Sequence, residues 1–173
     1  MALSSGRVQV SCEFRGRMDV SMMPPDADQR VRRIWEYWCS LRPAPGRFPA
    51  RRHFEPSAVP DLLPWLWLLD VERAPLRFRC RLVGTGHRDM MGREFTGRWA
   101  DEVFPRFAET RAHVDFVAAA AGEPRWFRGV PDFAPATEYA GTERLVLPLA
   151  ADGARIDLLL GVTLYRRDSG SLA

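Results

Sequence analysis

The first regular pattern along the chain is an apolar stripe with helical spacing between Asp26 and Leu41. Residues that recur every three or four positions share one face of an α-helix, so this spacing predicts an amphipathic N-terminal helix over 26–41. Pro24 and Pro25 precede the helix, and Pro43 ends it. The apolar face has to be buried, either against the domain or against a second copy of the helix. Its members, our candidate interface residues, are Val31, Ile34, Trp35, Trp38 and Leu41.

Patterns typical of strands follow. Residues 65–71 form an apolar run, which indicates a strand covered on both faces. Residues 76–83 alternate between apolar residues and arginine, which indicates a strand with one buried and one wet face. The connection between them is too short for a crossover, so the pair is an antiparallel hairpin. Further strands are predicted over 125–130, 143–149 and 155–165.

Helices are predicted between the two groups of strands. Thr85 is placed to cap a short helix that Gly92 closes, and a longer helix is predicted from Pro105 to Ala121. Hairpins on both sides of a helical stretch predict an antiparallel sheet with helices on one face, which is an α+β fold. The core stripe of the longer helix is interpreted as Phe107, Val114, Ala118 and Ala121, with Val117 beside it.

The order of these elements resembles the PAS fold, and the local strings resemble a bacterial stand-alone PAS family formerly catalogued as a domain of unknown function. The strings are L-P-W-L-W-L-L-D at 63–70, F-R-C-R-L-V-G-T at 78–85, G-R-E-F-T-G at 92–97, E-R-L-V-L-P-L at 143–149 and D-L-L-L-G at 157–161. The resemblance covers about residues 30–165. It implies a PAS-like five-stranded antiparallel sheet and a sensor or adaptor role in bacterial signalling.

PAS helices line a central cavity, so the resemblance also suggests a ligand pocket. Methionine adapts to irregular shapes, which suits a pocket wall as well as ordinary core packing. A small apolar ligand is the expected occupant. The predicted walls are Phe78, Cys80 and Leu82 on the sheet, Met91, Val114 and Val117 on the helices, and Leu147 and Leu149 on the far strand; the candidate polar contacts are His87, His113 and Arg128.

Catalytic and metal-binding patterns are missing from the sequence. The three histidines share no ligand spacing with each other or with a cysteine, so we predict no metal site and no cofactor. Some PAS domains hold haem through a helix histidine, and by that resemblance His113 or His87 would be the ligand. No nucleophile motif occurs, so we predict a non-catalytic protein. The alternative is a small-molecule enzyme, which would need a cavity histidine or carboxylate within hydrogen-bond reach of a second polar group.

Composition narrows the possible partners. The net charge is +3 and all 25 basic residues are arginine. They are dispersed along the chain, so we do not expect a nucleic-acid partner. Three scattered cysteines favour reduced thiols in a cytoplasmic protein, and no apolar run approaches the roughly 18 residues of a membrane span. We therefore expect a cytoplasmic module that acts through a homodimer or a signalling partner.

The predicted domain occupies residues 24–166 and includes the N-terminal helix. Residues 1–23 show no clear period and are interpreted as a flexible N-terminal extension. This segment contains three further methionines that are alternative candidates for the translation start: Met18, Met22 and Met23. Residues 167–173 are interpreted as a C-terminal tail.

Overall fold

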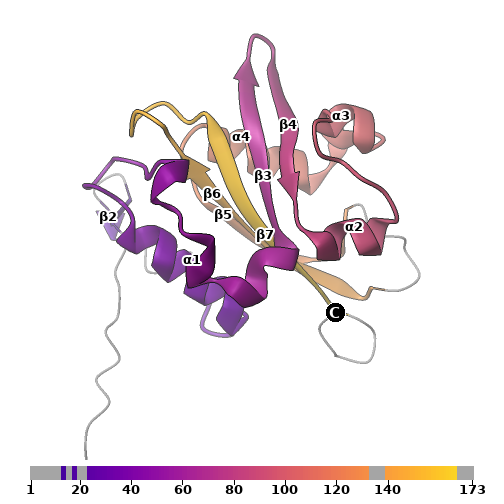
Figure 1. The fold of residues 1–173 in the computed structure, drawn as a ribbon, viewed down its shortest axis with the longest axis horizontal. Helices are drawn as coiled ribbons and strands as arrows, with labels where there is room; N and C mark the ends of the chain where they lie inside the picture. Colours follow the sequence, from indigo (N-terminus) through magenta and orange to yellow (C-terminus); the bar gives the residue numbers. More distant parts are fainter. Residues whose placement is uncertain (1–12, 15–16, 19–22, 133–138, 167–173) are drawn as a thin grey trace, which may run out of the picture.

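Five strands form one antiparallel sheet in the order β4-β3-β7-β6-β5 (Figure 1). The computed structural model describes residues 13–14, 17–18, 23–132 and 139–166. The sheet confirms the predicted α+β class and the five-stranded antiparallel arrangement. Its strands are β3 (Leu66–Arg73), β4 (Leu76–Val83), β5 (Arg125–Gly129), β6 (Gly141–Leu149) and β7 (Leu158–Arg166).

Most of the predicted N-terminal extension lies outside the described residues, as does the whole C-terminal tail over 167–173. The described part of the extension contains a short antiparallel pair, β1 (Glu13–Phe14) with β2 (Arg17–Met18). The domain boundaries at residues 24 and 166 remain a prediction.

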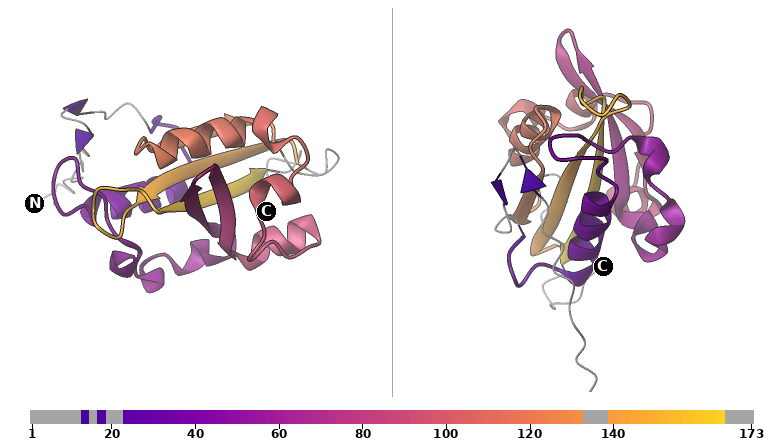
Figure 2. Two further views of the ribbon diagram at one scale, coloured as in Figure 1. Left: turned by 90° about the horizontal axis from the view of Figure 1, so that it is seen from above. Right: turned by 90° about the vertical axis from the view of Figure 1, so that its left-hand side faces the viewer.

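One face of the sheet is covered by helix α1 (Gln29–Ser40) and the short 3-10 helices η2 (Arg51–His53), η3 (Pro56–Ala58) and η4 (Pro60–Trp65) (Figure 2). The Asp28 carboxylate begins α1 by accepting a hydrogen bond of 2.8 Å from the Arg30 backbone N–H. The helix therefore begins at Gln29, slightly later than the predicted start at Asp26.

The apolar stripe of α1 is packed against the chain's own sheet. Val31, Ile34 and Trp38 are fully buried, Trp35 is 9% exposed, and Leu41 packs at the margin of the same cluster. The indole N–H of Trp38 donates to the Pro148 carbonyl of β6 at 3.0 Å. The prediction that this stripe forms an interface is therefore corrected, because burial against the domain already uses the side chains that a second copy would contact.

The opposite face carries α2 (Thr85–Met91), α3 (Ala100–Val103), η5 (Phe107–Glu109) and α4 (Arg111–Ala120). Helix α4 begins later than predicted because the backbone of Thr110 is extended, which separates α4 from η5, and the Thr110 hydroxyl caps α4 by accepting from the His113 backbone N–H at 3.2 Å. The sheet thus lies between α4 on one side and α1 with the 3-10 helices on the other, as both views of Figure 2 show.

A close contact between β3 and β7 shapes the α4 face. The Trp67 indole lies over Gly161, where an added Cβ would come within 1.9 Å of the ring. The same indole donates to the Thr163 hydroxyl oxygen at 2.9 Å. Glycine at position 161 therefore permits the tryptophan to lie flat against the sheet and to form part of the floor beneath α4.

Candidate functional site

A cavity of about 90 Å³ lies between the sheet and the helices α2 to α4. Its apolar wall combines strand, helix and loop residues that belong to the core cluster on this face. Aromatic rings dominate this wall, so it favours an apolar group in a ligand. The principal apolar lining residues are Trp67, Leu69, Phe95, Ala100, Phe104 and Phe116.

Polar side chains from β6 and β7 line the other end of the cavity. Arg144 pairs with Thr163 across the two strands, and Thr142 pairs with Tyr165. Because side chains alternate along a strand, these four residues share the face that α4 covers. All four line the cavity. The cavity is therefore amphipathic, with an apolar body and one polar end.

His87 and Tyr165 meet at this polar end. His87 Nε2 lies 2.8 Å from the Trp65 carbonyl oxygen, which can only accept, so Nε2 carries the proton. Nδ1 is then the acceptor that faces the Tyr165 hydroxyl at 3.4 Å. Burial lowers the pKa of His87 to about 4, against the opposing effect of the Trp65 hydrogen bond, and burial raises the pKa of the Tyr165 phenol. Both groups are neutral near pH 7.

A buried ionic cluster joins the cavity to α4. Arg144, whose side chain is 6% exposed, donates to Asp115 of α4 at 3.0 Å and to Asp132 at 3.2 Å. The Asp132 carboxylate also accepts from the backbone N–H groups of Arg111 and Ala112 at the start of α4. Asp132 and Arg144 both line the cavity. The cluster therefore fixes the start of α4 relative to the cavity's polar end.

Cys80 lines the same cavity, but its thiol has low reactivity. Burial is the largest influence on its thiol and raises the pKa to about 11. The thiolate, which is the nucleophilic form, is therefore scarce near pH 7. Cys80 contributes shape to the cavity and no nucleophile.

Three of the predicted pocket residues, Cys80, His87 and Met91, line the cavity, although their role as ligand contacts remains a prediction. Phe78 is buried nearby and packs on the Phe107 and Phe116 rings without lining the cavity.

Leu82 is on the wrong face for the predicted pocket. Leu68 pairs with Leu82, but Leu69 pairs with Cys80, so Arg81 is an extra residue in a β-bulge. One extra residue reverses the alternation of a strand. Leu82 consequently lies beside η4 on the α1 face, 44% exposed, while Val83 takes its place in the cavity wall.

The predicted inward face of α4 is also wrong. Val114 is 54% exposed and Val117 is 37% exposed, and His113 packs its ring on Phe107 outside the cavity lining. The face that meets the sheet includes Asp115 and Phe116 together with small alanines. The inner face of α4 could not be recognised from its apolar residues, because it contains the charged Asp115. Asp115 can be buried there because arginines contact its carboxylate.

Leu147 and Leu149 are buried on the opposite face of β6, where they pack beneath α1. A strand that is apolar on both faces has no alternation from which the cavity side can be chosen. Arg128, the third polar candidate, also lies away from the cavity. It donates to Glu143 at 2.9 Å and forms an ion pair with Asp26 just before α1.

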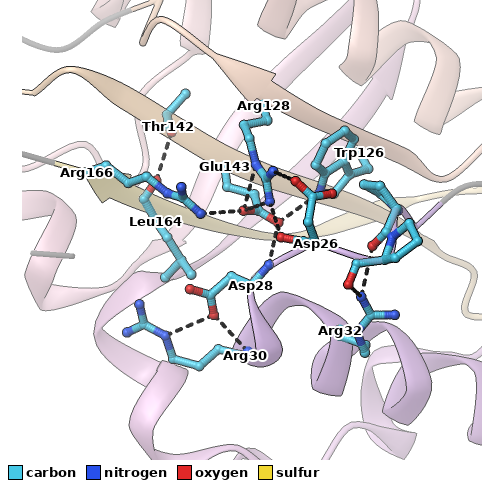
Figure 3. A network of polar contacts seen from close by, with 12 residues as sticks. Asp26, Asp28, Arg30, Arg32, Trp126, Arg128, Thr142, Glu143, Leu164 and Arg166 are labelled. Carbon is cyan, nitrogen blue, oxygen red and sulfur yellow. Dashed lines mark hydrogen bonds and ion pairs between the residues drawn. The ribbon is translucent and has the colours of Figure 1, made fainter. Parts of the chain in front are cut away.

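Glu143 is the centre of this second ionic network (Figure 3). Its carboxylate is 1% exposed and accepts from the backbone N–H of Asp28 and from the Trp126 indole, each at 3.0 Å. Arg128 and Arg166 supply the positive charge. Glu143 therefore ties the start of α1 to three strands of the sheet.

Apart from Arg128, which was assigned to the pocket, the charged residues of both networks were not identified from the sequence. The available signal was T-E-R at 142–144, three polar residues at the start of an otherwise apolar strand. Alternation places Glu143 on the α1 face and Arg144 on the α4 face. Two consecutive residues of β6 thus have different roles: Glu143 binds the start of α1, and Arg144 lines the polar end of the cavity.

The two histidines that the PAS resemblance offers as haem ligands are differently placed. Both ring nitrogens of His87 already face protein groups, and His113 does not line the cavity. Within the described residues, no group of three or more histidine, cysteine, aspartate or glutamate side chains is arranged to hold a metal ion.

Residues 27–164 match the family model described as PAS domain, which covers most of the chain and all five strands of the sheet up to the last residues of β7. The chain belongs to the PAS domain family, a family of sensory and signalling modules. No curated protein matches the chain significantly. Among the described residues, no helix is both long enough and apolar enough to cross a membrane.

Proposed function

We propose that this domain is a non-catalytic sensor in bacterial cytoplasmic signalling, which binds a small ligand in the cavity beneath α4 and passes the signal to a protein partner. The observation that carries the proposal is the amphipathic cavity. Apolar pockets with a few convergent polar groups are typical ligand sites in proteins. A volume of about 90 Å³ restricts the occupant to a small molecule.

A route from the cavity to α1 supports the sensor role. Arg144 lines the cavity, and the adjacent Glu143 accepts the Asp28 N–H at the start of α1. A ligand that shifts the backbone of β6 at Arg144 necessarily moves Glu143 on the other face. The signal then takes the form of a change in how firmly α1 is held.

The partner would contact α1 without removing it from the sheet. Burial of a large apolar side chain contributes about 1.5–3 kcal/mol, and Val31, Ile34, Trp35 and Trp38 are all buried. Undocking the helix would cost an amount comparable to the whole stability of a domain, roughly 5–15 kcal/mol. We therefore place the contact on the polar outer side of α1, where Arg33 and Glu36 lie exposed. The partner is either a second copy or a signalling protein.

Native mass spectrometry of the full chain, purified without denaturation, tests the cavity proposal. We expect a bound small molecule that is lost in Ala100→Leu, because Ala100 is buried in the cavity wall and leucine fills the space. Val114→Leu, on the exposed side of α4, is the matched control and should retain the ligand. Equal ligand retention in both variants would refute the cavity as the binding site.

One observation favours the alternative of a small-molecule enzyme. His87 and Tyr165 form a polar pair in the cavity, which is the feature such an enzyme requires. A general base works best with a pKa near the working pH, however, and burial lowers the pKa of His87 to about 4. The ligand released from the purified protein should therefore have the same mass before and after prolonged incubation. A product of different mass that Tyr165→Phe abolishes would favour the enzyme.

A further inference from the structure

Two hydrogen-bond donors at the polar end of the cavity lack an acceptor among the described residues. The Nε–H of Arg144 is buried and finds no acceptor among the described residues. Thr163 accepts from the Trp67 indole and retains its own hydroxyl proton as a donor. Arg144 and Thr163 are directly opposite each other on β6 and β7 and both line the cavity. A buried donor without an acceptor is costly, so this end of the cavity calls for an acceptor oxygen.

The charges around Arg144 favour an anionic acceptor. Asp115 contacts three arginines, Arg111 at 3.0 Å, Arg125 at 3.5 Å and Arg144 at 3.0 Å. Asp132 is the second carboxylate of the cluster. Three guanidinium groups therefore face two carboxylates, which leaves one positive charge in excess. A single negative charge on the ligand would balance it.

Asp132 shows that a carboxylate can bind beside Arg144 at the polar end of the cavity. Its carboxylate receives hydrogen bonds from Arg144 Nη1 and from two backbone N–H groups of α4. It leaves the Nε edge of the guanidinium unused. Arginine binds carboxylates through more than one edge of its planar fork, so a second carboxylate can use this free edge.

The size of the cavity limits the rest of the ligand. A cavity of roughly 150 Å³ is known to hold one benzene molecule. A volume of about 90 Å³ therefore suits a smaller body, which the aromatic wall of Phe104 and Phe116 would cover.

We infer that the cavity binds a short-chain carboxylate, whose carboxylate accepts from Arg144 Nε–H and the Thr163 hydroxyl and whose alkyl end packs on the aromatic wall. This inference rests on the proposed function and names the ligand class for the same site.

Isothermal titration of the full chain with propionate, propionamide and 1-propanol tests the ligand class. The three probes are similar in size, but only propionate carries a charge. Charge-assisted hydrogen bonds are about twice as strong as neutral ones, so propionate should bind about tenfold more tightly than either neutral probe. Equal binding of all three would overturn the carboxylate assignment and leave the cavity as a ligand site. Binding of none would overturn the assignment and count against the cavity as well.

Three variants locate the carboxylate. Arg144→Lys keeps the charge but loses the planar fork, and should weaken propionate binding about tenfold. Arg111→Lys is the matched control, because Arg111 touches Asp115 without lining the cavity, and should change the affinity by less than about twofold. Asp132→Asn removes a negative charge beside the ligand and should strengthen binding about threefold or more, even though it weakens the start of α4.

Circular dichroism and thermal unfolding establish that each variant is folded before titration. A purely structural role for Asp132 predicts weaker or unchanged propionate binding in Asp132→Asn, so that result would overturn the assignment. Equal losses in Arg144→Lys and Arg111→Lys would overturn it too, because they would show that the cluster acts only through its overall charge.

Discussion

Thr142, Glu143 and Arg144 interrupt an apolar strand with three consecutive polar residues, all of them buried. Burying a charge costs free energy, and replacing a buried ion pair by well-packed apolar residues is often neutral or stabilising. Stability alone therefore does not account for two separate buried ionic networks on one strand. Their positions on opposite faces of β6 instead connect the cavity with α1.

His87 makes the stability of the domain depend on pH. Its pKa is lowered from 6.5 to about 4 in the folded protein, mainly by burial. The contribution of neutral His87 is complete above pH 6.5 and is lost as the pH falls from 6.5 to 4, because over this range the unfolded chain binds a proton that the folded chain does not. The free energy of unfolding should fall by up to about 1.4 kcal/mol per pH unit from this residue.

Urea unfolding between pH 7 and pH 4 measures this effect as a difference between proteins. His87→Gln keeps a donor for the Trp65 carbonyl and should show a shallower loss of stability than the wild type. His53→Gln, at an exposed histidine, should follow the wild type. Parallel curves for the wild type and His87→Gln would contradict the burial of a neutral His87.

Gly161 should tolerate no side chain. An added Cβ would overlap the Trp67 indole at 1.9 Å, so Gly161→Ala should displace the ring from the cavity floor and cost about 1–3 kcal/mol of unfolding free energy. Gly141→Ala is the matched strand control, because its Cβ would meet only the Gly129 carbonyl oxygen at 3.6 Å. Urea unfolding that gave both variants the same stability would contradict the packing of Trp67 over β7.

At the level of elements, α1 depends on Glu143 for its position on the sheet. Glu143→Gln removes the charge that Arg128 and Arg166 neutralise and should lower the unfolding free energy by about 3 kcal/mol, at the lower end for a broken buried pair because Arg128 is partly exposed. Urea unfolding measures the loss. Asp61→Asn breaks the exposed ion pair between Arg33 of α1 and Asp61 of η4 and should cost less than about 0.5 kcal/mol. Similar losses of unfolding free energy in both variants would contradict the role of Glu143 in positioning α1.

The elements that could be predicted from the sequence are those with a one-sided pattern. The bounds of β4 follow from the alternation of apolar residues and arginine over 76–83, and α1 follows from its stripe. Faces were harder to assign. The bulge at Arg81 reverses β4, the buried charge of Asp115 hides the inner side of α4, and β6 is apolar towards both layers. Each of these depends on contacts between distant residues that local periodicity does not contain.

At the level of the whole molecule, the sheet separates two layers with different roles. The α4 layer lines the cavity, and the α1 layer carries the helix proposed to meet a partner. A ligand shifts a conformational equilibrium only by as much as it binds the two states differently. Contact with Arg144 offers such a difference, because movement of β6 alters the Glu143 anchor on the other side.

Hydrogen exchange of the α1 amides, measured with and without saturating propionate, tests this central claim most directly. The account predicts that filling the cavity changes exchange at the start of α1, around Arg30 and Val31, although the cavity lies across the sheet from that helix. Glu143→Gln should abolish the change while leaving propionate bound. Changes confined to α4 and the cavity strands, with α1 unaffected in the wild type, would contradict the account.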